Sequence, residues 1–144
     1  MSRHGARERA LQTLFQLDLN RMAPEEAAAH TVAIVGREEQ DQAYFGLLLR
    51  GVLSARDRID PVIAEYSQEW RVDRMPGVDR NILRIGTFEL LYQEDIPPAV
   101  VLDEAVELCK EYGTERSSKF VNGVLAGMLR DLDALRANAG KQPL

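Results

Sequence analysis

The N-terminal residues best suited to chemistry are arginines at helical spacing. Arg3 and Arg7 are one helical turn apart, and Arg7 continues the apolar row of Leu11 and Leu14. We therefore expect Arg7 to point along the packed face and Arg9 to point away from it. Arginine suits phosphate recognition because its planar guanidinium can donate two hydrogen bonds at once. Arg7 is thus either a salt-bridge partner or one wall of a phosphate-binding site.

A lysine next to a phenylalanine is the second candidate, in the segment KFVNG at 119–123. The apolar stripe of the surrounding helix places Phe120 at its border and Lys119 away from it. An aromatic ring beside a cation is a typical platform for an unpaired base, although Phe120 could equally cover the core. Gly123 in mid-helix costs about 1 kcal/mol relative to alanine, which predicts close approach of another helix or a ligand.

The third candidate is Asp79, in the segment VDRN at 78–81. It precedes a stretch with apolar residues on almost every side, which is typical of a helix buried at the centre of a fold. Asp79 either caps this helix or presents an acceptor to a partner, because the linker before it must be exposed.

Catalytic and metal-binding sets are missing from the sequence. The glycines are isolated and form no phosphate-binding loop. Asp103 and Glu107 are one turn apart and could hold a cation, but acids in a first helical turn are also what the helix dipole favours. With two histidines and one cysteine, the chain lacks the usual ligands of a zinc site. We therefore expect no enzyme, no metal and no cofactor, and we expect Cys109 to be a buried, small apolar residue.

Composition points to an ordinary folded protein of 144 residues, with 45% hydrophobic and 28% charged residues. No apolar run is long enough for a membrane span, and the single cysteine fits a reducing compartment, so we expect a cytoplasmic protein. The net charge of -5 argues against a uniformly basic nucleic-acid coat. The first 21 residues nevertheless carry four arginines against two acids, which permits local RNA binding.

Seven helical segments and no strand are expected, so the fold class is all-α. Asp60-Pro61 is predicted to start a new helix, with aspartate as cap and proline in the first turn. Gly113 is predicted to end another as a left-handed cap. We expect one domain over 1–137, with helical halves 1–58 and 59–137, and a disordered tail at 138–144. The expected helices cover about 3–21, 24–36, 39–58, 60–69, 78–93, 98–112 and 115–135.

Five stretches together resemble the NusB family. They are ARE at 6–8 with ALQ at 10–12 and LFQ at 14–16, VDRNILRI at 78–85, FELLY at 88–92 with DIP at 95–97, DEAVEL at 103–108, and KFVNGVL at 119–125. Each motif alone is weak, but five in order over nearly the whole chain are specific. The resemblance implies two helical subdomains and a non-catalytic transcription antitermination factor.

The resemblance also implies partners and site residues. Family members pair with the ribosomal protein NusE, bind single-stranded boxA RNA and act on RNA polymerase with other Nus factors. The matching RNA-binding positions are Arg3, His4, Arg7, Lys119 and Phe120. Phe15 and Asp79 match positions at the NusE interface. The arginine run at the start is sparser than in many members, and Phe15 replaces a tyrosine found in some.

Three alternatives remain open at this point. The chain could be a helical protein–protein adaptor that never touches RNA, which the acidic net charge favours. It could resemble the RNA-binding domain of ribosomal RNA cytosine methyltransferases, although the sequence stops at Leu144 without a catalytic domain. The helix-one face with Leu17 and Leu19 suits either a homodimer or the NusE interface.

Overall fold

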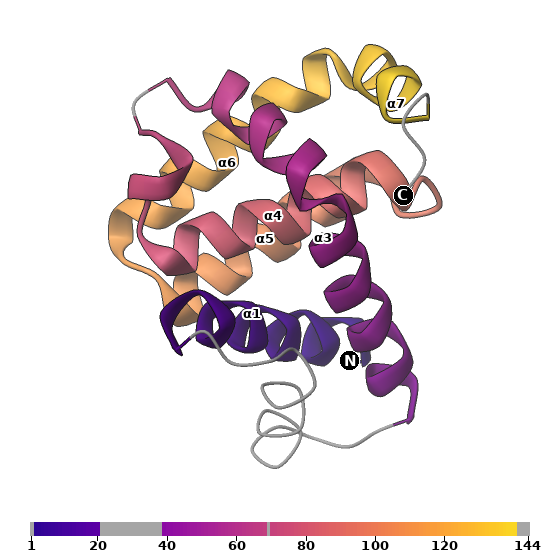
Figure 1. Cartoon of the computed structure of the whole chain (residues 1–144), viewed down its shortest axis with the longest axis vertical. Coiled ribbons are helices and arrows are strands. Elements are labelled where there is room, and N and C mark those ends of the chain that lie inside the picture. The colour runs from indigo at the N-terminus through magenta and orange to yellow at the C-terminus, as the bar shows by residue number, and fades with distance from the viewer. Residues whose placement is uncertain (1, 21–38, 69, 141–144) are drawn as a thin grey trace.

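The computed structural model describes residues 2–20, 39–68 and 70–140, and the regular elements in these ranges are all helices (Figure 1). This confirms the expected all-α class. None of the described helices is long and apolar enough to cross a membrane. The expected helix at 24–36 lies outside the described residues. The elements are α1 (Ser2–Asn20), α3 (Glu39–Tyr66), the 3-10 helix η1 (Val72–Arg74), α4 (Gly77–Tyr92), α5 (Pro98–Tyr112), α6 (Glu115–Arg130) and α7 (Leu132–Gly140).

Helix α4 is the central element, as its apolar sequence predicts. Every residue from 81 to 90 is buried, and the helix packs against α1, α3, α5, α6 and α7. Figure 1 shows it crossing the middle of the molecule, with α1 on one side and α6 on the other. The buried apolar side chains of all these helices form one continuous cluster.

Helix α3 runs through the proline that was expected to start a new helix. The prediction of a break at Asp60-Pro61 is wrong, because Pro61 lies inside a continuous helix of 28 residues. Proline removes a helical hydrogen bond, but its neighbours hold the segment in place: Ile59 and Ile63 are fully buried, and Asp60 binds Arg84 of α4 at 2.9 Å. The boundary expected between residues 58 and 59 therefore falls within one helix.

The C-terminal helix, in contrast, is divided. A turn at Asp131 separates α6 from α7, where the sequence predicts one helix over 115–135. The Asp131 carboxylate accepts a hydrogen bond from the Tyr66 hydroxyl at 2.6 Å, so the end of α3 is attached at this turn. Residues 138–140, expected in the tail, belong to α7, and residues 141–144 lie outside the described part.

Gly113 ends α5 as expected, but not in a left-handed conformation. Its φ is -105° and its ψ is -166°, which is extended backbone open to other residues. Space explains the glycine instead, since a Cβ here would lie 2.6 Å from Ser117 Oγ. Thr114 and Ser117 form the capping box that starts α6.

Two helix-interior glycines stand in opposite surroundings. A Cβ on Gly51 of α3 would lie 2.2 Å from the ring of Phe88 in α4, so this glycine lets the two helices approach. A Cβ on Gly123 of α6 would meet no atom within 4 Å. The expected approach of another helix to Gly123 is therefore not found among the described residues, and this position is exposed.

Exchanging each of these glycines for alanine tests the α3–α4 contact. Gly51→Ala gains helix propensity but overpacks against Phe88, so we expect a net loss of about 1–3 kcal/mol in the free energy of unfolding. Gly123→Ala is the matched control and should gain up to about 1 kcal/mol. Urea unfolding followed by circular dichroism measures both. Equal stabilisation by the two substitutions would show that the α3–α4 approach does not depend on glycine.

Candidate functional site

Arg7 is buried in the interior, where its guanidinium binds a carboxylate of α4. The side chain is 3% exposed, and Nη2 lies 2.9 Å from Glu89 Oε2, while Nε donates to both oxygens at 3.0 and 3.1 Å. Tyr44 of α3 donates its hydroxyl to the same carboxylate, and Arg7 Nη1 lies 3.7 Å from Glu104 of α5. Arg7 is thus the salt-bridge partner, and the expectation that it contacts RNA does not fit its burial.

Arg9 also departs from its predicted direction. It was expected to point away from the packed face, but it is 1% exposed. Its guanidinium carbon lies 4.2 Å from the centroid of the Phe45 ring, a cation–π distance. The reason is that α3 covers this side of α1 as well.

Arg3 is the N-terminal cation that reaches the surface. Its side chain is 45% exposed and lies 3.8 Å from Asp95, while its guanidinium carbon lies 4.6 Å from the centroid of the Tyr44 ring. An exposed pair at this distance is weak, so Arg3 is available to a negatively charged ligand.

His4 lies among carboxylates of α1 and α5. Nδ1 is 2.8 Å from Glu104 Oε2, and Nε2 is 3.1 Å from Glu111 Oε1 and 3.7 Å from Glu8 Oε1. The hydrogen bond to Glu104 raises the pKa of His4, with burial opposing the rise and the three carboxylates adding to it. These acids make the immediate surroundings of His4 unfavourable for an RNA phosphate.

Asp79 connects α4 to the start of α6. It is 3% exposed, and its Oδ1 accepts a hydrogen bond from Ser117 Oγ at 2.7 Å. Burial raises the pKa of Asp79, and the bond from Ser117 offsets part of this rise. Burial also raises the pKa of Cys109 to about 12, with the charge of Asp79 contributing, which agrees with the buried, unreactive cysteine expected. Asp79 therefore faces the interior rather than a partner.

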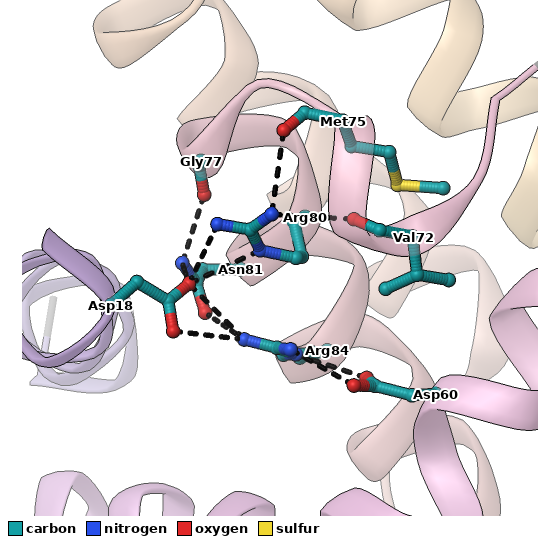
Figure 2. Close-up of polar contacts among 8 residues, drawn as sticks. All are labelled: Asp18, Asp60, Val72, Met75, Gly77, Arg80, Asn81 and Arg84. Atoms are coloured by element: carbon teal, nitrogen blue, oxygen red, sulfur yellow. Dashed lines mark hydrogen bonds and ion pairs between the residues drawn. The ribbon is translucent and has the colours of Figure 1, made fainter.

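The two residues after Asp79 in the VDRN motif bind Asp18 of α1 (Figure 2). Arg80 Nε and Asn81 Nδ2 donate to Asp18 Oδ2 at 3.1 and 2.9 Å. Arg84 donates to Asp18 at 3.2 Å and to Asp60 of α3 at 2.9 Å. Burial alone would raise the pKa of Asp18, but the bond from Asn81 and the charges of Arg84 and Arg80 lower it. The motif thus fastens α1 and α3 to α4.

An open cavity of about 520 Å³ lies beside this network. Its lining includes Arg71 and Val72 as well as Asp18, Asp60 and Arg80. The arginines here are matched by nearby aspartates, and Arg71 itself pairs with Asp73 at 3.0 Å. The cavity therefore has no surplus of positive charge to attract RNA.

Lys119 and Phe120 lie at the surface beside Trp70, which comes shortly before η1 in the chain. Phe120 is half-buried and Lys119 exposed. Trp70 is 42% exposed, and its ring meets the Phe120 ring edge-on, with centroids 5.3 Å apart and an interplanar angle of 62°. The neighbouring positions 122 and 123 are also exposed. We call Trp70, Lys119 and Phe120 the aromatic platform. In the sequence, the signal for this site is the only tryptophan of the chain, which lies between the helices expected at 60–69 and 78–93.

Phe15 lies at the meeting point of α1 and α4. It is half-buried, and a Cβ on Gly77 would lie 2.9 Å from its ring, so the ring rests on the start of α4. Four residues on, Leu19 is 67% exposed. Phe15 and Leu19 form an apolar strip on α1, which we call the α1 strip.

The expected RNA-binding residues do not form one surface by direct helix packing. Within the described ranges, α1 packs mainly against α3 and α4, whereas α6 packs mainly against α5 and α4. Arg3 and the aromatic platform are therefore two separate exposed places. Glu89 and Glu111, which bind Arg7 and His4, and Asp18, which binds Arg80, were missed because each is distant in sequence from its partner.

Comparison with known proteins gives matches over nearly the whole chain. The family model described as NusB family matches residues 4–130. Transcription antitermination protein NusB of Bacillus pumilus (strain SAFR-032) is 44% identical over 132 residues, which are 92% of this chain and 98% of that protein.

Solved structures agree with this match. T. maritima NusB has a TM-score of 0.78 and 33% identity, covering 95% of this chain and 92% of that one. A chain from the crystal structure of antitermination factors NusB and NusE in complex with dsRNA has a TM-score of 0.80 and 30% identity, covering 90% and 97%.

The fold and these matches define the class as an all-helical, non-catalytic transcription antitermination factor. The chain belongs to the NusB family. The resemblance drawn from the five sequence motifs is thereby confirmed.

Removing one side of the buried Arg7–Glu89 pair should destabilise the fold. Arg7→Met leaves the Glu89 carboxylate buried without its cation, so we expect a loss of about 3–5 kcal/mol in the free energy of unfolding. Arg3→Met, in the exposed pair with Asp95, is the matched control and should lose at most about 1 kcal/mol. Urea unfolding of the three proteins gives the values. A loss for Arg7→Met no larger than the control's contradicts the structural role.

The raised pKa of Asp79 predicts a pH dependence of stability. In the unfolded chain this group titrates near pH 4, and in the folded chain it titrates higher. Between the two values the folded state binds more protons, so stability falls as pH rises. Relative to Asp79→Asn, the parent should therefore lose stability from about pH 4 upward until the folded group is ionised. Urea unfolding of both proteins between pH 4 and 8 measures this; a constant difference or one of opposite slope would exclude it.

Proposed function

We propose that this chain acts as a transcription antitermination factor that binds single-stranded boxA-type RNA together with the ribosomal protein NusE. The observation that carries the proposal is the similarity over 90% of the chain to a structure of NusB and NusE in complex with double-stranded RNA. The same proposal places the protein in the cytoplasm, where it would act on RNA polymerase through other Nus factors.

The aromatic platform is the proposed RNA contact. Unpaired bases stack on exposed aromatic rings, and cations beside them attract the backbone. Trp70 and Phe120 supply two rings, and Lys119 supplies an exposed cation beside them. Arg3 is a further exposed cation at a separate place on the surface. Arg7 is not included because it is bound to Glu89 inside the protein, and His4 is not included because three carboxylates surround it.

The α1 strip is the proposed contact for NusE. Phe15 and Leu19 offer apolar surface on a helix otherwise packed against α3 and α4. Asp79 is not part of this contact, because it is buried and its carboxylate binds Ser117 of α6. The alternative for the same strip is a contact between two copies of this chain. Measuring the molecular mass in solution, with and without NusE, distinguishes a homodimer from a complex with NusE.

A helical adaptor without RNA binding is the alternative function. The observation in its favour is the net charge of -5, which repels nucleic acid at long range. An adaptor would bind NusE and show no RNA binding by either the chain or the complex.

RNA titration over a salt series tests the aromatic platform. Each cation in contact with single-stranded RNA contributes about -0.7 to the slope of log affinity against log salt. Lys119→Ala should flatten the slope by about that amount. Phe120→Ala and Trp70→Ala should each weaken binding by about 1–3 kcal/mol, the usual value of base stacking, with the slope unchanged.

The control for charge is Lys110→Ala, which removes an exposed cation of α5 whose partner is Glu107. It should leave affinity and slope as in the parent. Circular dichroism confirms that each variant is folded. If all the platform variants bind boxA RNA with NusE as the parent does, the RNA surface lies elsewhere; if no protein binds RNA but NusE still binds, the adaptor function is correct.

A further inference from the structure

The His4 cluster has a geometry that a simple ion pair does not require. Two carboxylates, from Glu8 and Glu111, face the same ring nitrogen, Nε2, at 3.7 and 3.1 Å. A third carboxylate, Glu104, lies 2.8 Å from the other nitrogen, Nδ1. One imidazole carries at most a single positive charge, and Arg7, which lies 3.7 Å from Glu104, already binds Glu89. The acids around His4 therefore leave negative charge uncompensated. A cation of higher charge would balance it.

From this arrangement we propose that His4, Glu8 and Glu111 bind a divalent transition-metal ion such as Zn²⁺. One ligand atom from each residue lies within 4.8 Å of the other two. Ligands at about 2.0–2.1 Å from a tetrahedral zinc ion stand roughly 3.4 Å apart. The two distances from Nε2, 3.1 and 3.7 Å, bracket that spacing.

The residues around the three ligands have the arrangement that metal sites use to orient them. A metal-binding histidine usually gives its second ring nitrogen to a carboxylate, which fixes the tautomer. Glu104 takes that position at Nδ1 and leaves the lone pair of Nε2 for an ion. The Tyr112 hydroxyl donates to the second oxygen of Glu8 at 2.6 Å, and Gln12 donates to Tyr112 at 3.2 Å.

The donor set selects the class of metal. Magnesium and calcium prefer ligands that are all oxygen, whereas an imidazole nitrogen with carboxylates suits zinc, nickel or cobalt. His4 and Glu111 are 27% and 39% exposed at their side chains, so solvent can supply the remaining ligand. The ion would join the start of α1 to the end of α5.

The count of cysteines and histidines in the sequence pointed away from such a site. His4 and Glu8 are one turn apart on α1, but Glu111 is 107 residues from His4, and only the packing of α5 on α1 brings it in. The acids first considered for a cation, Asp103 and Glu107, do not belong to this cluster, and Glu107 lies 3.6 Å from Lys110.

Metal titration of the untagged chain, freed of metal by a chelator, tests the proposal without RNA or NusE. Calorimetry with Zn²⁺ should show one site per chain, and Co²⁺ should give the visible absorption of a four-coordinate ion. His4→Gln and Glu111→Gln should each weaken zinc binding at least tenfold. Glu107→Gln and His30→Gln, which remove another acid of α5 and the other histidine, should bind as the parent does.

Thermal unfolding provides a second readout. Zinc should raise the melting temperature of the parent and of the two controls, and leave that of Glu111→Gln unchanged. Absence of a saturable single site, or equal zinc affinity in the parent and Glu111→Gln, would overturn the proposal. Either result leaves the proposed RNA function standing, because that function rests on Trp70, Lys119 and Phe120.

Discussion

The buried ion pair between Arg7 and Glu89 is the constraint on which the arrangement of the helices depends. A carboxylate buried in the last turn of α4 is costly unless a cation and further donors accompany it, and here Arg7 and Tyr44 both bind it. Their helices, α1 and α3, must therefore keep their register against α4. The second network, from Asp18 through Arg84 to Asp60, connects the same three helices at another place, so α1 cannot slide or rotate without breaking both.

Because these two networks use charged side chains of α1, few of the charged residues on this helix are available to a ligand. Arg7 and Arg9 are buried and Asp18 is engaged by α4, which leaves Arg3 as the exposed arginine of the described part of α1. The acidic body then repels nucleic acid except where cations and rings reach the surface. RNA recognition by stacking on the aromatic platform suits such a protein, because stacking needs little net charge.

The α5–α6 corner shows how one buried acid can serve several elements. Asp79 accepts a hydrogen bond from Ser117, and Ser117 also completes the capping box that starts α6. The orientation of α6, and with it the direction of Lys119 and Phe120, therefore depends on an α4 residue about forty positions earlier in the chain. A substitution at Asp79 would therefore affect Lys119 and Phe120 indirectly, by changing the orientation of α6.

Periodicity and motif content by themselves determined the all-α class, the central position of α4 and membership of the NusB family, because each rests on local spacing within a helix. The continuity of α3 through Pro61 was decided by tertiary structure, since the burial of Ile59 and Ile63 outweighs the local cost of proline. The partners of Arg7, His4 and Asp79 were decided in the same way. A charged side chain at the edge of a helical stripe has the same pattern whether it meets a ligand or a buried carboxylate, and only the packing of distant helices distinguishes the two.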